Sequence, residues 1–395
     1  MPHLILSSYS PPSLPTTYDD VEFLWRAKGE KKELWGTAVG QNAYLFNVVP
    51  HTHGVLVKSD KLTRSSDIEE LKRVLRTFAR VTNATVYADN IPSKNRPPLA
   101  DSQMAPDAAC AGYPWPSRVA LEIGFGSGRH LLWRAKESPE ILFIGVEIHK
   151  PSLEQLLKQC HLQGITNVRA VDYDANLFLE TLPDGLLETI YLHFPIPWIK
   201  SPGRNIFCWQ LVDEARRVLK PGGTLELRTD DRWYLGWALE ILADTPHAFF
   251  EVAKDRNIEV MSKYEARWRR QGKEIADVIY YNTHPVASKR ELRSMSFDCE
   301  LSFTEVVRRL AAFKPVIGPD YLLKVGSAYT IDATSGLIPL IMGSMMRPEK
   351  RYLLIHGGNL SYYPTPPLCT RAGYQAHRKL LEIVKGEANE FDSSY

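Results

Sequence analysis

A glycine-rich turn is the first stretch whose residue types and spacing suggest chemistry. The segment Leu121–Gly128 has the sequence LEIGFGSG, in which an apolar run gives way to the closely spaced Gly124, Gly126 and Gly128. Glycines at a strand-to-helix junction let a ligand lie against the backbone at a helix N-terminus. The dinucleotide-binding pattern requires a further glycine one place after Gly128, and that place is Arg129. The loop therefore disfavours NAD and leaves room for a smaller adenosyl ligand.

Three carboxylates accompany this loop at spacings that suit the same ligand. Glu122 lies inside the glycine segment, and Glu147 ends the next apolar run, about 20 residues beyond the glycines, where an acid binds ribose hydroxyls in folds of this kind. Asp174 follows the third apolar run, where a carboxylate is within reach of an adenine amino group. The neighbouring Asp172 is better explained as a solvated turn residue. We therefore expect Glu122, Glu147 and Asp174 to line one crevice.

The elements that must position these residues form a continuous pattern. From Arg118 onward, short apolar runs alternate with helical stretches. This alternation is typical of βαβ units, in which helices cover both faces of a parallel sheet. The central part of the chain is therefore predicted to be an α/β, Rossmann-like domain with a twisted, mostly parallel sheet. Its expected strands are Val119–Ile123, Ile141–Ile148, Val168–Val171, Thr189–Phe194 and Thr224–Arg228.

The segment before the central part has a different texture. Strands are expected on both sides of a Gly29–Lys32 turn, near Tyr44–Val49 and near Val55–Lys58. Apolar residues from Ile68 to Phe78 recur at helical spacing with Lys and Arg between them, which predicts a basic amphipathic helix. Packing of this helix on the strands is the favoured explanation, and an RNA-contacting face is the alternative. The stretch 93–116 is rich in proline and is predicted to be a linker.

These patterns divide the chain into three expected domains. Residues 1–112 form a β-rich N-terminal extension that includes the basic helix and the linker. Residues 113–300 form the α/β domain. Residues 301–395 form an α+β C-terminal module, with helices expected at Phe303–Phe313 and Tyr374–Lys385.

Composition limits the class of protein. The chain has 395 residues, of which 44% are hydrophobic and 24% charged, as in ordinary folded globular proteins. A net charge of +2 does not indicate a nucleic-acid binder unless the basic residues cluster locally. The five cysteines are far apart and include no C-x-x-C pair, which argues against a zinc site and a disulfide framework. With no leader pattern and no apolar run of about 18 residues, we expect a cytoplasmic protein that binds neither membrane nor metal.

From about Arg118 to Tyr281 the sequence resembles the bacterial tRNA (guanine-N7)-methyltransferase family. The matching pieces follow one another in the order of the family's motifs, and six ordered matches are far more specific than a single loop. They are Glu122–Gly128 (EIGFGSG), Gly145–Leu153 (GVEIHKPSL), Asp174–Ala175, Phe194–Lys200 (FPIPWIK), Thr229–Tyr234 (TDDRWY) and Ser262–Arg267 (SKYEAR) with Gly272.

The resemblance implies a class I S-adenosylmethionine-dependent methyltransferase that forms 7-methylguanosine in the variable loop of tRNA. The cofactor that it implies is S-adenosyl-L-methionine, bound by Glu122, Gly124, Gly126, Gly128, Glu147, Ile148, Asp174 and Ala175. It also implies a nucleoside-binding set of Lys200, Asp230, Ser262, Lys263, Tyr264 and Glu265, and the further substrate-binding candidates are Arg204 and Arg267. The expected partner is tRNA, and both a monomer and a homodimer remain open.

The residue types on the substrate side suit this chemistry. A guanine presents N1–H and an amino group on its Watson–Crick edge, so that Asp230 or Glu265 can accept from both and reject adenine. Lys200, Arg204 and the basic residues further along can hold tRNA phosphates, although a solvated helix face also explains the latter. Trp198 is expected either to stack on a base or to pack in the core.

Two departures from the family pattern concern the same side. The family's usual Phe-Pro-Asp-Pro-Trp has Ile196 in place of the acid, and the basic run after Lys200 is thinned. Guanine N7 carries a lone pair and no proton, so methyl transfer needs alignment but no general base. We therefore expect Ile196 to be tolerated. Asp230 and Glu265 are the candidate catalytic residues, which would stabilise positive charge developing on the imidazole ring.

Two alternatives stay open. One is a catalytically weakened tRNA-binding or scaffold protein of the same fold, which would have no need to keep Glu122, Glu147 and Asp174 together. The other is a methyltransferase for another RNA, which would not require the matches at Asp230 and Ser262–Glu265. A tRNA-modifying enzyme is therefore the favoured hypothesis.

Overall fold

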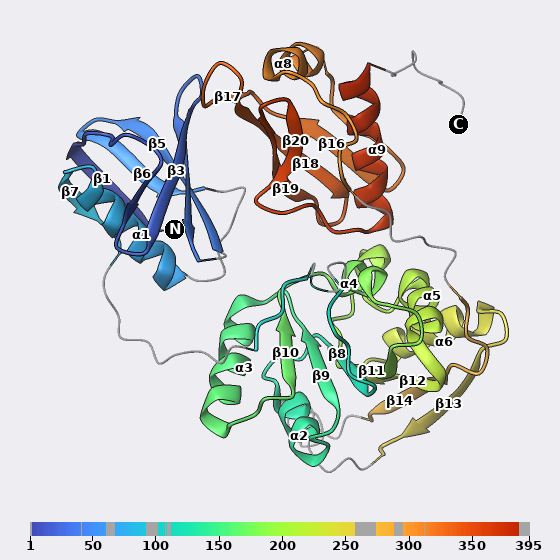
Figure 1. Ribbon diagram of the computed structural model, residues 1–395. Helices are drawn as coiled ribbons and strands as arrows, with labels where there is room; N and C mark the ends of the chain where they lie inside the picture. The colour runs from blue at the N-terminus through green and yellow to red at the C-terminus, as the bar shows by residue number, and fades with distance from the viewer. Residues whose placement is uncertain are drawn as a thin grey trace. The chain divides into compact units, whose positions relative to one another are not determined.

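The computed structural model describes residues 2–40, 42–60, 68–91, 102–106, 108, 112–256, 274–287, 295–311 and 313–386. The chain divides into two compact units. The central unit comprises residues 96–292 with Leu368–Thr370, and the flanking unit comprises residues 1–95, 293–367 and 371–395. Figure 1 shows the central unit mainly in green and yellow and the flanking unit in blue, orange and red.

A seven-stranded sheet forms the centre of the central unit. Its strands lie in the order β10-β9-β8-β11-β12-β14-β13 (Figure 1). The first five are parallel, whereas β14 pairs antiparallel with both β12 and β13. The prediction of a mostly parallel sheet is therefore confirmed. The bounds are β8 Val119–Ile123, β9 Leu142–Val146, β10 Val168–Val171, β11 Leu187–His193, β12 Leu219–Thr229, β13 Phe249–Lys254 and β14 Ala276–Tyr281.

Helices cover both faces of this sheet because its middle strands are apolar on both sides. Every residue of β8 and β9 is buried, which explains why these segments are continuous apolar runs. Successive strand residues point to opposite faces, so that Phe143 packs with one group of helices and Ile144 with the other. The first group is α2 Arg129–Glu137 and α3 Lys150–Gln163; the second is α4 Ala175–Thr181, α5 Trp209–Val218 and α6 Arg232–Asp244.

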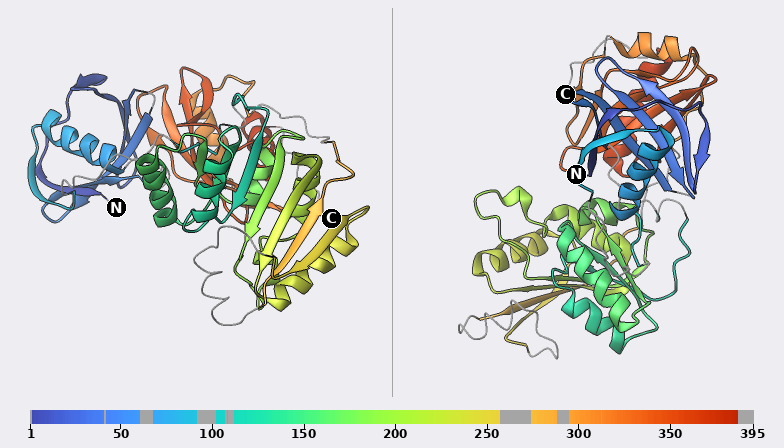
Figure 2. Two further views of the ribbon diagram at one scale, coloured as in Figure 1. Left: turned by 90° about the horizontal axis from the view of Figure 1, so that it is seen from below. Right: turned by 90° about the vertical axis from the view of Figure 1, so that its left-hand side faces the viewer.

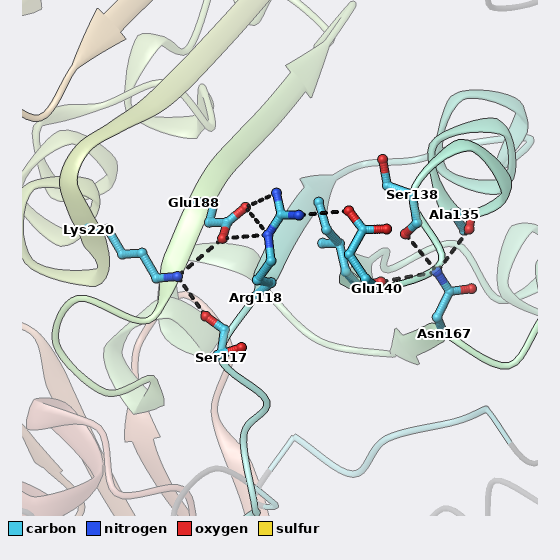
Figure 3. Close-up of polar contacts among 9 residues, drawn as sticks. Ser117, Arg118, Ala135, Ser138, Glu140, Asn167, Glu188 and Lys220 are labelled. Carbon is cyan, nitrogen blue, oxygen red and sulfur yellow. Dashed lines mark hydrogen bonds and ion pairs between the residues drawn. The ribbon is translucent and has the colours of Figure 1, made fainter.

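Charged side chains tie together the starts of three strands at the amino edge of the sheet (Figure 3). Arg118, which precedes β8, lies 3.0 Å from a carboxylate oxygen of Glu188 on β11 and 2.7 Å from one of Glu140. Lys220 of β12 contacts the same Glu188 carboxylate at 3.2 Å. Hydrogen bonding from Arg118, and secondarily from Lys220, lowers the pKa of Glu188. Glu188 is therefore held in its ionised form at this edge.

Two short segments outside the expected boundaries also belong to the central unit. The N–H of Met104 donates to the carbonyl of Ala170 on β10 at 2.9 Å, and the N–H of Ala170 donates to the carbonyl of Ser102 at 2.7 Å. Met104 and Leu368 are both buried in the core of this unit. Residues 102–104, which lie within the stretch predicted to be a linker, therefore extend the sheet. The sequence did not indicate this extension, because so short a segment shows no apolar period.

The cysteine prediction needs a correction. Cys369 takes part in a disulfide bond, whereas Cys160 and Cys208 carry free thiols. Spacing along the sequence did not indicate this bond, because the fold decides which cysteines meet. Within the described ranges, none of the helices has the length and hydropathy of a membrane span, and no group of three His, Cys, Asp or Glu side chains is placed to hold a metal ion.

The flanking unit is assembled from both ends of the chain, as Figure 2 shows. Its sheet has 13 strands among the described residues, with the path β15-β16-β18-β17-β3-β4-β5-β6-β1-β7; β2 pairs with β3, and β19 pairs with β18 and β20. The two ends join where Thr330 of β17 pairs with Lys28 of β3. The bounds are β1 His3–Ser8, β2 Thr16–Tyr18, β3 Val21–Lys28, β4 Glu33–Val39, β5 Asn42–His51, β6 Gly54–Ser59, β7 Thr85–Asp89, β15 Val316–Ile317, β16 Tyr321–Val325, β17 Tyr329–Thr330, β18 Gly336–Ser344, β19 Glu349–His356 and β20 Asn359–Tyr363.

Apolar packing links the two ends of the chain in this unit. A buried cluster combines residues of β3 to β5 with residues of β17 to β19, among them Leu34, Leu45 and Tyr352. The hydroxyl of Tyr352 donates to Asp60 at 3.2 Å. The expected boundaries at 112 and 300 treat the two ends as separate modules, whereas the structure groups them in one unit.

The predicted helices of the flanking unit are present. α1 runs from Ile68 to Val81 and buries Leu71, Val74, Leu75 and Phe78. α8 Phe303–Ala311 and α9 Arg371–Lys385 match the two helices expected near the C-terminus. On α1, Lys72 pairs with Glu69 at 2.8 Å, and Arg73 pairs with Asp20. These contacts support the explanation in which α1 packs on the strands and pairs its charges with neighbouring acids.

Candidate active site

The carboxyl edge of the parallel strands brings most of the candidate residues together. β8 to β12 run in one direction, so the segments that follow them meet at the same edge. The glycine loop follows β8, Glu147 follows β9, Asp174 follows β10, and Asp230 follows β12. From β8 the chain continues to β9 on one side and later to β11 on the other. Open α/β sheets bind ligands at such a switch point.

The glycine loop has an open face. Gly124, Gly126 and Gly128 have φ values of 67°, 53° and 72°, which residues with side chains disfavour. A Cβ atom on Gly124 would meet nothing within 4 Å, and one on Gly126 would meet only the Gly124 carbonyl oxygen at 4.0 Å. A Cβ atom on Gly128 would lie 2.7 Å from Leu156 of α3. The first two glycines therefore leave the backbone open on one side, and the third lets α2 start close to α3.

Glu147 fastens the glycine loop to the end of β9. Its carboxylate accepts hydrogen bonds from the N–H groups of Gly126 at 3.2 Å, Ile148 at 2.8 Å and His149 at 2.9 Å. The Glu147 side chain is half-buried, and Ile148 is 65% exposed. The acid predicted to bind ribose is thus held at the rim of the loop by three backbone donors.

Glu122 lies deeper than the other two acids. It is only 3% exposed, and its Oε2 lies 2.8 Å from Nδ1 of His130 on α2. The ring of His193 lies 4.4 Å from that of His130. Loss of solvation, then His130 and nearby arginines, hold the pKa of His193 well below its usual range, so that His193 is neutral at pH 7. The sequence predictions omitted His130, although its place at the second residue of α2, directly after the glycine loop, was an available signal.

Asp174 is the N-cap of α4. Its Oδ1 accepts from the N–H of Leu177 at 3.2 Å, and the following Ala175 is buried. Capping alone explains an aspartate at this position. Because capping uses one carboxylate oxygen, the other oxygen still has acceptor capacity for a ligand.

The loop after β11 is held by local contacts. Phe194 has a φ of 51°, unusual for a residue with a side chain, and its N–H donates to the carbonyl of Arg228 at 2.7 Å. The N–H of Trp198 donates to Oδ1 of the buried Asn205 at 2.8 Å, and the Arg204 guanidinium lies 3.8 Å from the centre of the Trp198 ring. Trp198 is 37% exposed. Trp198 is therefore not packed in the core, which leaves stacking on a base as the alternative.

Two adjacent acids follow β12 on the side proposed to meet the substrate. On the loop after β11, Lys200 is exposed and Ile196 is 68% exposed. After β12, Asp231 caps α6 by accepting from the N–H of Tyr234 at 2.8 Å. The half-buried Asp230 precedes this cap. Ser262, Lys263, Tyr264, Glu265 and Arg267 lie outside the described residues.

The sheet order, the helices on both faces and the glycine loop after β8 define the fold of a class I S-adenosylmethionine-dependent methyltransferase. A family model described as a putative methyltransferase matches residues 116–278. Among solved structures, an S-adenosylmethionine-dependent methyltransferase from Aquifex aeolicus is similar at 18% identity and a TM-score of 0.29, over 46% of this chain and 90% of that one.

Curated relatives identify the family. A tRNA (guanine-N(7)-)-methyltransferase from Wolinella succinogenes is 36% identical over 97% of this chain and 99% of its own length. One from Campylobacter fetus subsp. fetus is 31% identical over 97% of this chain and 99% of its own length. The chain belongs to the tRNA (guanine-N7)-methyltransferase family. The match also includes both ends of the chain, which the sequence motifs do not cover.

Proposed function

We propose that this chain transfers a methyl group from S-adenosyl-L-methionine to N7 of a guanosine in the variable loop of tRNA, forming 7-methylguanosine. Relatives named for methylation of guanine N7 in tRNA match nearly the whole chain, and this observation carries the proposal. The geometry supports it, because the glycine loop, Glu147, Asp174 and Asp230 follow strands that end at one edge of the sheet.

The donor side consists of the glycine loop and the two strand ends next to it. The exposed backbone at Gly124 and Gly126 fits an adenosyl ligand that lies against the loop. Glu147 uses its oxygens for three N–H donors, and a carboxylate accepts about four hydrogen bonds, so that it can take one more from a ribose hydroxyl. Asp174, Ile148 and Ala175 complete this side, with Glu122 holding His130 beneath the loop. S-adenosylmethionine, when bound, supplies a methyl group on a positively charged sulfur.

The acceptor side aligns the guanine and stabilises charge. Asp230 would accept hydrogen bonds from the Watson–Crick edge, which turns N7 away from that acid and fixes the orientation of the base. Because N7 has no proton to lose, no residue has to act as a base. Carboxylates at Asp230 and Glu265 would favour the positive charge that develops on the ring. Ile196 takes no part in proton transfer and is compatible with turnover.

Contacts with tRNA outside the base would come from the loop after β11 and from the segment 262–267. Lys200 and Arg204 would bind phosphates, and the exposed Trp198 would stack on a base. The guanidinium over the Trp198 ring gives this loop a flat cationic surface, which suits both an aromatic base and a phosphate.

The test is methyl transfer from labelled S-adenosylmethionine to unmodified tRNA, followed by digestion to nucleosides. We expect labelled 7-methylguanosine with the wild type and a loss of roughly 100-fold in Asp230→Ala, the size typical of removing one electrostatic contact to a transition state. Asp213→Ala is the matched control, because Asp213 is an exposed acid on α5, and its activity should equal the wild type.

Each outcome separates the proposal from its rivals. Donor binding without any labelled nucleoside would favour the scaffold function. A labelled nucleoside other than 7-methylguanosine, or labelling of ribosomal RNA alone, would identify a different methyltransferase.

A further inference from the structure

A buried ion pair lies close to the carboxyl edge of the central sheet. Arg228 on β12 is 1% exposed and Asp277 on β14 is 5% exposed, and the two are cross-strand neighbours. Nη1 of Arg228 donates to both carboxylate oxygens of Asp277, at 2.7 and 2.9 Å. Nη2 donates to the carbonyl of Arg256 at 3.0 Å. One guanidinium thus links β12 to β14 and to the segment that follows β13.

The backbone of Arg228 is connected to the other loops of the acceptor side. Its carbonyl accepts from the N–H of Phe194 at 2.7 Å, at the start of the loop that carries Trp198 and Lys200. Two residues after Arg228, the chain reaches Asp230. The position of Arg228 therefore affects both segments that are proposed to meet the guanosine.

The β13–β14 hairpin is closed just beyond the same contacts. The N–H of Asp255 donates to the carbonyl of Ile275 at 2.7 Å, and the N–H of Ile275 donates to Oδ1 of Asp255 at 3.0 Å. The bond from Arg228 to the Arg256 carbonyl lies next to this closure. Along the sequence, the residues that separate Arg256 from Ile275 include Ser262–Glu265, the remaining nucleoside-binding candidates.

Stability alone does not account for this pair. Replacing a buried ion pair with apolar residues of similar volume is often neutral or stabilising. What apolar residues cannot supply is a set of directed bonds, and a lysine cannot reproduce the planar fork of arginine. The specific effect of Arg228 and Asp277 is to fix the end of one hairpin relative to the end of β12.

We infer that Arg228 and Asp277 are positioning residues for the acceptor side of the site. They hold Phe194, Asp230 and the backbone of Arg256 in fixed relative positions, without contacting tRNA themselves. This inference rests on the proposed function. It predicts that disturbing the pair raises the KM for tRNA, whereas the affinity for the donor at the ends of β8 to β10 stays unchanged.

The test is the double variant Arg228→Met/Asp277→Leu, which removes both charges so that neither is left buried alone. At saturating donor we expect the KM for tRNA to rise at least tenfold. The Kd for S-adenosylhomocysteine, the donor without its methyl group, should stay within twofold of the wild type. Hydrogen exchange should accelerate in 249–256 and 274–281 and remain unchanged in 119–123.

A matched control exists at another buried arginine of the same unit. Arg217 on α5 donates to Glu214 at 2.9 and 2.8 Å and to the carbonyls of Leu179 and Leu182. The variant Arg217→Met/Glu214→Leu disturbs a buried ion pair within α5, together with the bonds from Arg217 to the α4 segment. Its KM for tRNA should match the wild type. Equal rises in KM in both double variants would overturn the inference, because they would show a general loss of packing.

Two further readouts keep the inference testable. If the double variant does not fold, Arg228→Lys provides the test instead. Arg228→Lys retains the charge but lacks the planar fork, so its KM for tRNA should rise by the same factor. A KM within twofold of the wild type, with unchanged exchange in 249–256 and 274–281, would refute the positioning effect. If the wild type itself forms no 7-methylguanosine, the proposed function fails, and the exchange pattern still decides whether the pair fixes the hairpin.

Discussion

Replacing Glu147 with alanine should weaken donor binding far more than it weakens the fold. Glu147 is half-buried, and its three N–H donors belong to the rim of the glycine loop. Water can reach these donors once the carboxylate is gone, so we expect a loss of only about 1 kcal/mol in the free energy of unfolding. Donor binding loses the proposed charge-assisted bond to ribose and the fixed position of the loop.

The size of the binding effect follows from the same contacts. A hydrogen bond to a charged group contributes about 1.5–3 kcal/mol, and 1.4 kcal/mol corresponds to a factor of ten. The Kd for S-adenosylhomocysteine should therefore rise roughly 10- to 150-fold in Glu147→Ala. In Glu147→Gln the rise should be smaller, because an amide keeps one oxygen acceptor.

Titration calorimetry with S-adenosylhomocysteine measures the Kd, and thermal unfolding without ligand measures the stability. Glu137→Ala serves as the control, because Glu137 is an exposed acid in the last turn of α2. A Kd in Glu147→Ala within twofold of the wild type would show that Glu147 only braces the loop. A large fall in unfolding temperature with unchanged affinity would point to the same conclusion.

Three other perturbations test separate parts of the structure. Gly128→Ala should lower the free energy of unfolding by about 1–3 kcal/mol, because φ is 72° and the new Cβ would lie 2.7 Å from Leu156. Denaturant titration measures this change, and an unchanged midpoint would contradict the prediction. The pKa of Glu188 is lowered mainly by Arg118, so this carboxylate stabilises the fold above its unfolded pKa and the contribution is lost as pH falls through the folded pKa. The difference in unfolding temperature between wild type and Glu188→Gln should therefore shrink on acidification below about pH 4.5, and a constant difference would count against the pairing. Arg204→Ala should weaken tRNA binding and reduce the slope of log affinity against log salt by about one, and an unchanged slope in filter binding would exclude a phosphate contact.

The sequence was informative wherever a residue is tied to the end of a predicted strand. Glu147, Asp174 and Asp230 each follow an apolar run, and parallel strands bring such positions to one edge whatever the details of packing. The strands themselves were predictable because β8 and β9 are buried on both faces and hence continuously apolar. The positions of these strands could be predicted from the local apolar pattern and the rules of βαβ connections.

Contacts between distant segments could not be predicted in this way. The pairing of Thr330 with Lys28 joins strands about 300 residues apart, and no period in either segment indicates its partner. The same holds for Arg228 with Asp277, since a charged residue inside an apolar run only signals that some partner exists. For Glu122, the sequence indicated a ligand contact, and the structure adds His130 as an immediate partner.

The order of the strands suggests that the site has two separable halves. The proposed donor side follows β8, β9 and β10 and includes the buried contact of Glu122 with His130. The proposed acceptor side follows β11 and β12 and continues to β13 and β14, and Arg228 of β12 forms a buried pair with Asp277 of β14. Because each half has its own buried polar contact, substitutions in one half should change one affinity and leave the other unchanged. Glu147→Ala and Arg228→Met/Asp277→Leu should therefore have nearly additive effects on the activation free energy calculated from kcat/KM. A strong departure from additivity would mean that the two halves are coupled.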